Sequence, residues 1–244
     1  MKLLLLLALT PLLVLTSCST QKEHDAAALA VLDSMSAQIG NLNSVSFTVM
    51  TTVDHKNGDA NVAQRNIQTE CYMVGPNKLH LYSDGDSNRV GYWYNGKTLT
   101  YYSYAKNTYV AVPAPGTILA TIDSVHNAYG VDFPAADFFY PSLSADIATE
   151  CSVVKMLGKA IIQGVSCDHI MTQSKDATTQ IWISRGLYRL PVRLLIEGKN
   201  GERYEATMMN WILDPVLDDE IFEFVVPEGA TKTTLTTVHE GDTK

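Results

Sequence analysis

The sequence predicts a mainly β protein, built on a strongly curved antiparallel sheet of about eleven strands with an N-terminal helix and a central helical insertion. Apolar and polar residues alternate in short runs from Val45 onward, and turn dipeptides such as Asn57-Gly58 and Asn95-Gly96 separate the runs. Two stretches, 25–40 and 117–129, show helical spacing instead. Because short hairpins join successive strands, a meander is favoured over a parallel sheet, whose crossovers are long.

Residues 25–40 form the first expected helix, which ends at the stop signal Gly40-Asn41. Its apolar stripe consists of Ala28, Leu32, Met35 and Ile39. Strands follow on both sides of the central insertion. They start at Val45 and then cover 63–74, 78–83, 89–94, 98–104, 108–112, 150–157, 164–173, 179–184, 190–197, 203–213 and 222–226.

The central insertion begins after Pro113-Ala114-Pro115-Gly116, which we expect to end a strand and start a helix. Thr117 is the expected N-cap of a helix over 117–129. Its apolar stripe consists of Ile118, Ile122, Val125 and Tyr129. A second short helix is expected within residues 135–140, directly after Pro134.

The first residues read as a secretory signal. Lys2 precedes an apolar run that is shorter than the roughly 20 residues of a comfortable transmembrane helix. Leu15-Thr16-Ser17-Cys18 matches the bacterial lipobox, whose cysteine is lipid-modified and becomes the first mature residue. We therefore expect residues 1–17 to be removed as a signal peptide and acyl chains on Cys18, such as palmitate, to anchor the protein to a membrane.

The residues after Cys18 address the chain to the bacterial cell envelope. Ser19, where an aspartate would retain the protein at the inner membrane under the enterobacterial sorting rule, favours the outer membrane. In other lineages acidic residues soon after the cysteine, here Glu23 and Asp25, can direct export to the surface. The sequence leaves open whether the chain faces the periplasm or the surface.

The formal net charge of −8 argues against nucleic acid as a partner, because phosphate binding needs clustered Lys and Arg. It also argues against adhesion to anionic lipid through a basic face. Residues 18–24 are expected to form a polar tether, residues 25–228 a single domain, and residues 229–244 a polar, disordered tail. No cofactor and no metal site are expected.

Three cysteines remain once Cys18 is lipidated: Cys71, Cys151 and Cys167. A disulfide is possible in an oxidising compartment, and the odd number leaves at least one free thiol. Cys151 and Cys167 flank one expected hairpin. A turn near Gly158-Lys159 would place Cys167 opposite about position 150, which leaves a bridge between them open.

The sequence lacks the usual catalytic motifs, such as G-x-S-x-G, H-E-x-x-H and Cys-x-x-Cys, so we expect no enzyme. Cys167-Asp168-His169 comes closest to a site: on a strand, Cys167 and His169 share a face about 7 Å apart. They could form a thiol–imidazole pair or two metal ligands, but no third ligand stands at a recognisable spacing. A buried cysteine beside a hydrogen-bonded histidine is the favoured interpretation. Asp218-Asp219-Glu220 is similarly interpreted as a solvated turn or the first turn of a short helix.

A resemblance rests on several segments in the second and third quarters of the chain. Residues 95–100 (NGKTLT), 112–118 (VPAPGTI), 164–169 (GVSCDH) and 180–183 (QIWI) resemble a family of predicted periplasmic proteins of unknown function. Such proteins are similar to the LolA-like fold group, which includes carriers and receptors of bacterial lipoproteins. The resemblance implies an unclosed half-barrel with helices as a lid over its concave face. It implies no biochemical activity.

An unclosed, lidded sheet favours a non-catalytic protein that binds an apolar ligand, a lipid or an acyl chain, in a cavity on its concave face. The candidates for the lid are Leu119, Ile122, Val125, Phe138 and Phe139, and those for the sheet are Trp93, Tyr102, Tyr104, Trp182 and Trp211. The same residues could simply fill the core. The alternatives are an interaction module that holds another envelope protein, or an enzyme using Cys167 and His169.

The tyrosine-rich segment from Tyr92 to Tyr104 does not form one aromatic surface. Tyr92 and Tyr94 share one strand face and Trp93 takes the other, and Tyr102 and Tyr104 oppose Tyr101 in the same way. The functional question therefore moves to the space beneath the lid.

Overall fold

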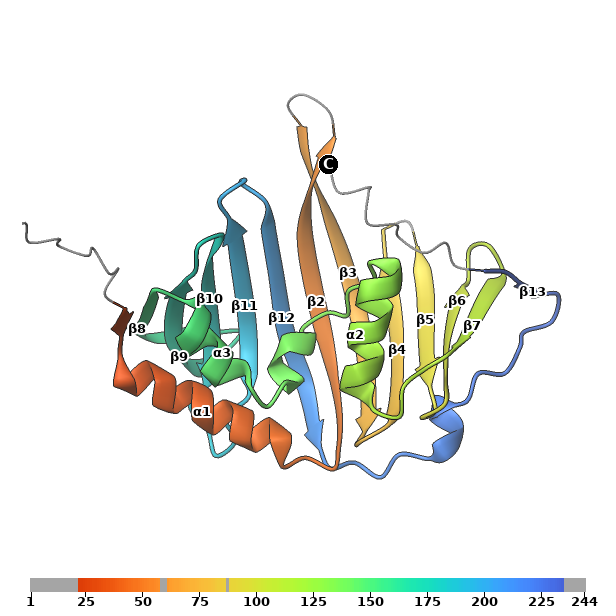
Figure 1. The fold of residues 1–244 in the computed structure, drawn as a ribbon, viewed down its shortest axis with the longest axis horizontal. Helices are drawn as coiled ribbons and strands as arrows, with labels where there is room; N and C mark the ends of the chain where they lie inside the picture. The colour runs from red at the N-terminus through yellow and green to blue at the C-terminus, as the bar shows by residue number, and fades with distance from the viewer. Residues whose placement is uncertain (1–21, 58–60, 87, 235–244) are drawn as a thin grey trace, which may run out of the picture.

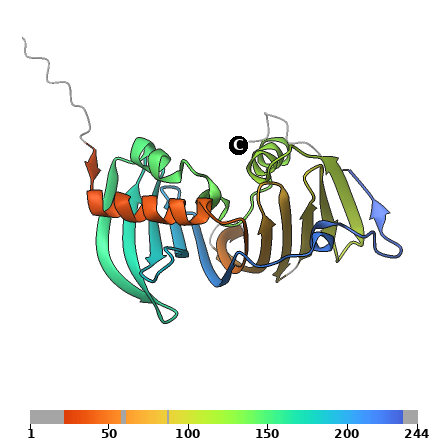
Figure 2. The same cartoon turned by 90° about the horizontal axis from the view of Figure 1, so that it is seen from below.

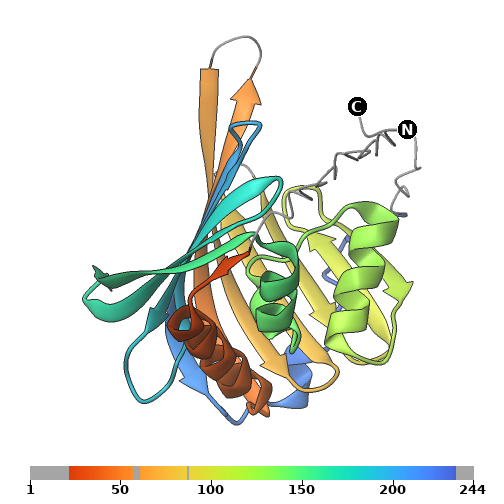
Figure 3. The same ribbon diagram turned by 60° about the vertical axis from the view of Figure 1, so that its left-hand side comes forward.

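The computed structural model describes residues 22–57, 61–86 and 88–234, which form a strongly curved antiparallel sheet that does not close (Figures 1 and 3). The mainly β prediction and the unclosed half-barrel are confirmed. Cys18 and the expected signal peptide lie outside the described residues. Within the described part of the chain, no helix is long and apolar enough to span a membrane.

The sheet has thirteen strands in the order β1-β8-β9-β10-β11-β12-β2-β3-β4-β5-β6-β7-β13. The strands of the first meander are β2 (Ser44–Asn57), β3 (Asn61–Val74), β4 (Lys78–Gly85), β5 (Arg89–Tyr94), β6 (Thr98–Ser103) and β7 (Thr108–Pro113). Those of the second are β8 (Val153–Ile162), β9 (Val165–Gln173), β10 (Ala177–Ser184), β11 (Pro191–Gly198) and β12 (Arg203–Leu213). Pairing of β12 with β2 joins the two meanders into one sheet.

Tight turns with residues at positive φ connect these strands, as the turn dipeptides predict. Gly96 (φ 88°) and Gly201 (φ 81°) take the left-handed conformation that a side chain disfavours. Asn107 (φ 48°) does the same in the β6–β7 turn, and asparagine tolerates that conformation better than most residues.

Two short parallel strands lie at the edges of the sheet and correct the predicted domain boundaries. β1 (Glu23–His24) pairs with β8, and the Lys22 ammonium donates to the carbonyls of Ala148 (2.9 Å) and Thr149 (2.6 Å). The last residues of the expected tether therefore belong to the fold. β13 (Thr231–Lys232) pairs with β7, so the prediction of disorder from residue 229 is wrong for these residues, since the open β7 edge gave them a partner.

Three α-helices lie on the concave face of the sheet (Figure 2). α1 (Ala26–Gly40) and α3 (Leu143–Glu150) pack together over the β8–β12 half, whereas α2 (Ile118–Tyr129) covers the other half. A 3₁₀ turn, η1 (Ala136–Phe139), lies between them where the second short helix is expected. α3 has no counterpart in the sequence prediction.

The β8–β12 half is filled by side chains. The predicted stripe of α1 is confirmed: Leu32 and Met35 are fully buried in the same cluster as Val154 and Ile170 of the sheet. Asp25 accepts a hydrogen bond from Ala27 N (2.8 Å) and caps the helix.

One continuous row of side chains crosses the concave face of the other half. Successive register pairs connect it from strand to strand, so all its members share one face. From β2 to β7 the row reads Phe47, Cys71, Leu81, Tyr92, Tyr101 and Val110.

The predicted strand over 222–226 is wrong. A 3₁₀ turn, η2 (Asp219–Phe222), occupies its start and packs against β4, where an ion pair joins Asp219 to Lys78. β4 is an interior strand with both edges paired, so the segment has no edge to join. The expectation of a short helical turn at 218–220 is confirmed.

The three described cysteines are free, which answers the open disulfide question. The β8–β9 turn falls at Gln163-Gly164, and the register pairs Cys167 with Ala160. Cys151 belongs to the core of the concave face, whereas Cys167 belongs to a separate cluster with Trp182. The turn near Gly158-Lys159 is therefore wrong, and the two thiols lie in different clusters.

Leu32→Ala is expected to lower the free energy of unfolding by about 3 kcal/mol, because it leaves a cavity in the filled half. Leu187→Ala, at a side chain that is 87% exposed, is the matched control and is expected to change stability by less than about 0.5 kcal/mol. Urea unfolding measures both. Equal losses for the two variants would contradict the assignment of α1 to the core.

Candidate ligand-binding cavity

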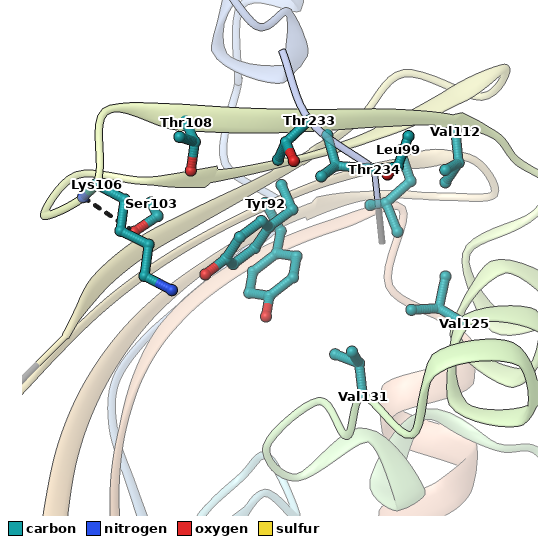
Figure 4. Close-up of a pocket in the computed structure, with 12 residues that line it drawn as sticks. Tyr92, Leu99, Ser103, Lys106, Thr108, Val112, Val125, Val131, Thr233 and Thr234 are labelled. Carbon is teal, nitrogen blue, oxygen red and sulfur yellow. Dashed lines mark hydrogen bonds between the residues drawn. The ribbon is translucent and has the colours of Figure 1, made fainter. Parts of the chain in front are cut away.

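A cavity of about 510 Å³ lies between α2 and the concave face of β5, β6 and β7 (Figure 4). Its volume is within the range of about 300–1,000 Å³ typical of small-molecule sites. It is lined by Tyr92, Leu99, Tyr101, Ser103, Lys106, Thr108, Val110, Val112, Val125, Val131, Thr233 and Thr234. The filled half of the sheet and this open half thus share one concave face.

The cavity changes from apolar to polar along the strands. The register pairs Leu99 with Val112 at one end and Ser103 with Thr108 at the other. Figure 4 shows Leu99, Val112 and Val125 at the end near α2, and Ser103, Lys106 and Thr108 at the β6–β7 turn. Leu99 and Ser103 are separated along β6 by a rise of about 13 Å.

The start of α2 is tied to the sheet. The N-cap prediction for Thr117 is confirmed, since its side chain accepts from Ala120 N (3.3 Å). The Pro115 carbonyl accepts hydrogen bonds from the hydroxyls of Tyr94 on β5 and of Thr121 (3.2 Å). These contacts fix the helix above the cavity.

Val131, just after the end of α2, also lines the cavity. Gly130 takes a left-handed conformation (φ 62°), and its N–H donates to the His126 carbonyl (2.8 Å). The chain then turns so that Val131 points toward the space beneath the helix (Figure 4). Val125 of the helix itself, which is 4% exposed, completes this wall.

Tyr92 lies in the middle of the cavity wall. Its ring contacts those of Tyr101 and Phe133, each with centroids 5.3 Å apart. Burial, and secondarily the neighbouring Tyr101 phenol, raise the pKa of Tyr92 to about 12. The wall is therefore uncharged here at physiological pH.

The C-terminal segment contributes to the opening. Pairing of Thr231 with Thr108, and of Lys232 with Tyr109, carries Thr233 and Thr234 to the cavity. The Thr233 N–H donates to the Tyr109 carbonyl (2.8 Å) and extends the pairing by one residue. The parallel register carries these two residues away from Thr108, and Figure 4 shows Thr234 beside Leu99, so their hydroxyls lie along the more apolar part of the wall.

The predicted lid residues separate into three groups. Val125 lines the cavity. Ile122 and Phe139 border a second void of about 20 Å³, which is too small for a ligand, and Phe138 is a core residue. Leu119 is half-buried and lines neither space.

Among the predicted sheet residues, Trp211 lies on the concave face but fills the core, stacked on Phe47 with ring centroids 4.3 Å apart. Trp93 and Tyr102 lie on the convex face, as a correction to the prediction, where both rings contact Phe224 of the C-terminal segment. Tyr104 is exposed beside Tyr102 on that face. Their parity along β5 and β6 is opposite to that of the core row.

Trp182 also lies outside the concave core, which corrects a further prediction. It belongs to the cluster of Cys167, Val192 and Leu195. The His169 ring stacks on its indole at 4.3 Å, and the Arg193 guanidinium lies 4.9 Å from the ring centroid. Side chains from two neighbouring strands, one of them a cation, thus hold the indole in place.

The sequence prediction missed Tyr92, Leu99, Tyr101, Val110 and Val112. The sheet candidates named from the sequence are all Trp or Tyr, whereas the alternation of side chains along a strand decides which face each one takes. Leu81 points inward, and following the alternation of inward and outward side chains from Leu81 through the next hairpins would have found these residues. The same alternation also places Ser103 and Thr108 on this face, whereas Lys106, Thr233 and Thr234 carry no comparable signal in the sequence.

Cys167 and His169 share one face, as predicted, but do not pair with each other. The fully buried Cys167 thiol donates to the Val165 carbonyl (3.4 Å), and burial raises its pKa. His169 Nε2 bonds instead to Gln180 Oε1 (2.8 Å). The described residues contain no group of three potential metal ligands. The geometry therefore supports the structural interpretation of this segment.

Asp168, between them, faces the other side and forms ion pairs with Arg185 and Arg189, the latter at 2.6 Å. Both arginines belong to the β10–β11 loop, so the buried carboxylate holds this loop against β9.

The family model described as "Predicted periplasmic protein (DUF2092)" matches residues 28–236. The chain belongs to this family, as the resemblance of its motifs predicts. A comparison with curated proteins gives no match.

Several solved structures are similar at low sequence identity. An uncharacterized conserved protein from Thermus thermophilus has a TM-score of 0.49 at 11% identity, covering 85% of this chain and 98% of that one. LprF from Mycobacterium bovis has a TM-score of 0.48 at 15% sequence identity, and the match covers 84% of this chain and 98% of that one. A LolA superfamily protein from Nitrosomonas europaea has a TM-score of 0.36 at 12% sequence identity, and the match covers 81% of this chain and 97% of that one.

The Tyr92 phenol is expected to make stability fall as pH rises from about 10 to about 12. Its pKa is raised in the folded protein, so its contribution is complete below about pH 10 and is lost as the pH passes through about 12. Tyr92→Phe should remove about 2 kcal/mol of this fall. Urea unfolding across this range measures it, with Tyr188→Phe at a half-exposed tyrosine as control; identical slopes for wild type and Tyr92→Phe would contradict the burial of this group.

Proposed function

We propose that this protein is a non-catalytic, lipid-anchored envelope protein that binds an apolar ligand, a lipid or an acyl chain, in the cavity beneath α2. The cavity of about 510 Å³ carries the proposal, because it has the size of a ligand site and lies beside a core of packed side chains on the same concave face. An opening beside a packed core is how small-molecule sites are commonly built.

The chemistry of the walls favours an alkyl chain. Leu99, Val110, Val112, Val125 and Val131 supply apolar surface on both the sheet and the helix side. Burial of a methylene group gains about 0.8 kcal/mol, so a chain of several methylenes is held firmly. The cavity offers neither an activated nucleophile nor a metal site within the described residues, which supports a binding role.

The proposed location follows from the family and the N-terminal sequence. The family is described as periplasmic, and the lipobox at Leu15–Cys18 supports removal of residues 1–17 and acylation of Cys18. We favour the outer membrane because Ser19 follows the cysteine.

Val131→Trp is expected to weaken binding of a fluorescent fatty acid at least about tenfold, because the larger indole would occupy the cavity. Val131 is chosen because it is only half-buried, so the protein should tolerate the larger side chain. Residues 19–244 retain every described element and serve as the soluble form. Ile161→Trp, at a side chain that is 75% exposed on β8, is the matched control. Titration by fluorescence measures both, and native mass spectrometry detects any ligand that copurifies.

Binding that Val131→Trp leaves unchanged would contradict a site in this cavity. A folded wild-type domain that binds no fatty acid and carries no copurified lipid would remove the proposal and favour the interaction-module alternative.

Cys18→Ser is expected to abolish acylation and release the protein from the membrane fraction, since a lipidated cysteine is the proposed anchor. Mass spectrometry of the mature N-terminus checks this directly in the wild type. An unmodified Cys18 in the wild-type protein would refute the anchor and leave the cavity proposal standing.

A further inference from the structure

Among the described residues that line the cavity, Lys106 is the one that carries a charge. It lies in the β6–β7 turn, is exposed, and forms no ion pair with any described residue. Figure 4 shows its side chain beside Ser103 and on the side of the opening away from Val125. An unpaired cation at the mouth of an otherwise uncharged cavity suits an anionic group of the ligand.

The hydroxyls of Ser103 and Thr108 lie at the same end of the cavity as this cation. Ser103 Oγ accepts the Lys106 backbone N–H (3.4 Å), which leaves the hydroxyl proton of Ser103 to donate. Thr108 is paired with Ser103 across the turn. An ammonium group with two hydroxyl groups nearby is a typical setting for a carboxylate or phosphate oxygen.

The apolar end of the cavity points in the opposite direction. From Ser103 and Thr108 the walls pass through Tyr101 and Val110 to Leu99 and Val112, about 13 Å along the strands. Tyr92 stays neutral in the middle, so its phenol places no negative charge there to compete for the cation. The site therefore has the polarity of an amphiphile.

We propose that the ligand is a single-chain amphiphile with an anionic head group, a carboxylate or a phosphate monoester, bound with its head at Lys106 and its alkyl chain toward Leu99 and Val112. This inference rests on the proposed function. It adds the class of ligand and the orientation in which the ligand is bound.

The experiment compares four dodecyl-chain probes on residues 19–244: dodecanoate, dodecyl phosphate, dodecanol and dodecyltrimethylammonium, each below its micellar concentration. Wild type is expected to bind one or both anions about tenfold more tightly than dodecanol. Lys106→Met should weaken anion binding about tenfold and leave dodecanol within about twofold. Lys106→Arg should retain the preference, and Lys106→Glu should favour the cationic probe.

Lys97→Met is the matched control, because Lys97 is an exposed lysine in the β5–β6 turn at the other end of the same strands. Thermal unfolding confirms that each variant is folded. The two anionic probes separate the sources: preference for dodecanoate indicates a fatty acid, and preference for dodecyl phosphate indicates a phosphate-bearing lipid.

Equal affinity of wild type for anions and dodecanol, or anion binding that Lys106→Met does not change, would overturn the head-group inference while the apolar-ligand proposal stands. Failure of all four probes to bind to folded wild type would overturn the proposed function and this inference together.

Discussion

The register of the β2–β7 meander is the constraint on which the rest of the structure depends. It aligns Phe47, Leu81 and Tyr101 on the same face across successive hairpins. A slip of one residue in any pairing would turn a whole strand's apolar set outward. The packing of α2, the filled core beside it and the polarity of the cavity all follow from this alignment, because each is built on the residues that it turns inward.

The difference between the two halves of the concave face reflects the side chains that meet there. In the β8–β12 half, long side chains of α1 such as Leu32 and Met35 reach fully into the sheet. Beneath α2 the walls are made largely of valine and threonine, whose short side chains leave space between helix and sheet. The cavity therefore results from the short side chains in this half, while the backbone forms the same curved sheet in both halves. Thr233 and Thr234 of the C-terminal segment line part of its wall.

Many elements of this fold could be predicted from short stretches of the sequence. The hairpin dipeptides, the α1 stripe and the Thr117 cap act over a few residues and were predictable. α3 was not, because its eight residues carry only one apolar pair at helical spacing, Leu143 and Ile147, which is too short a pattern to indicate a helix. β13 depends on pairing with β7, an edge far away in the sequence, which no local pattern reports. The prediction that Trp93 lines the cavity was wrong, because the type of side chain does not determine which face of the sheet a strand residue points to.

The contacts of Lys22 and β1 with the β8 side of the sheet have a consequence for the proposed membrane anchor. With a lipid on Cys18, the anchor would precede Lys22 by a stretch of chain that spans at most about 14 Å. Such an anchor would hold the β8 edge near the bilayer. Nine strand spacings separate β8 from β6, about 43 Å along the curved sheet. A ligand bound in the proposed cavity would then be exchanged on the side of the molecule far from an anchor at Cys18.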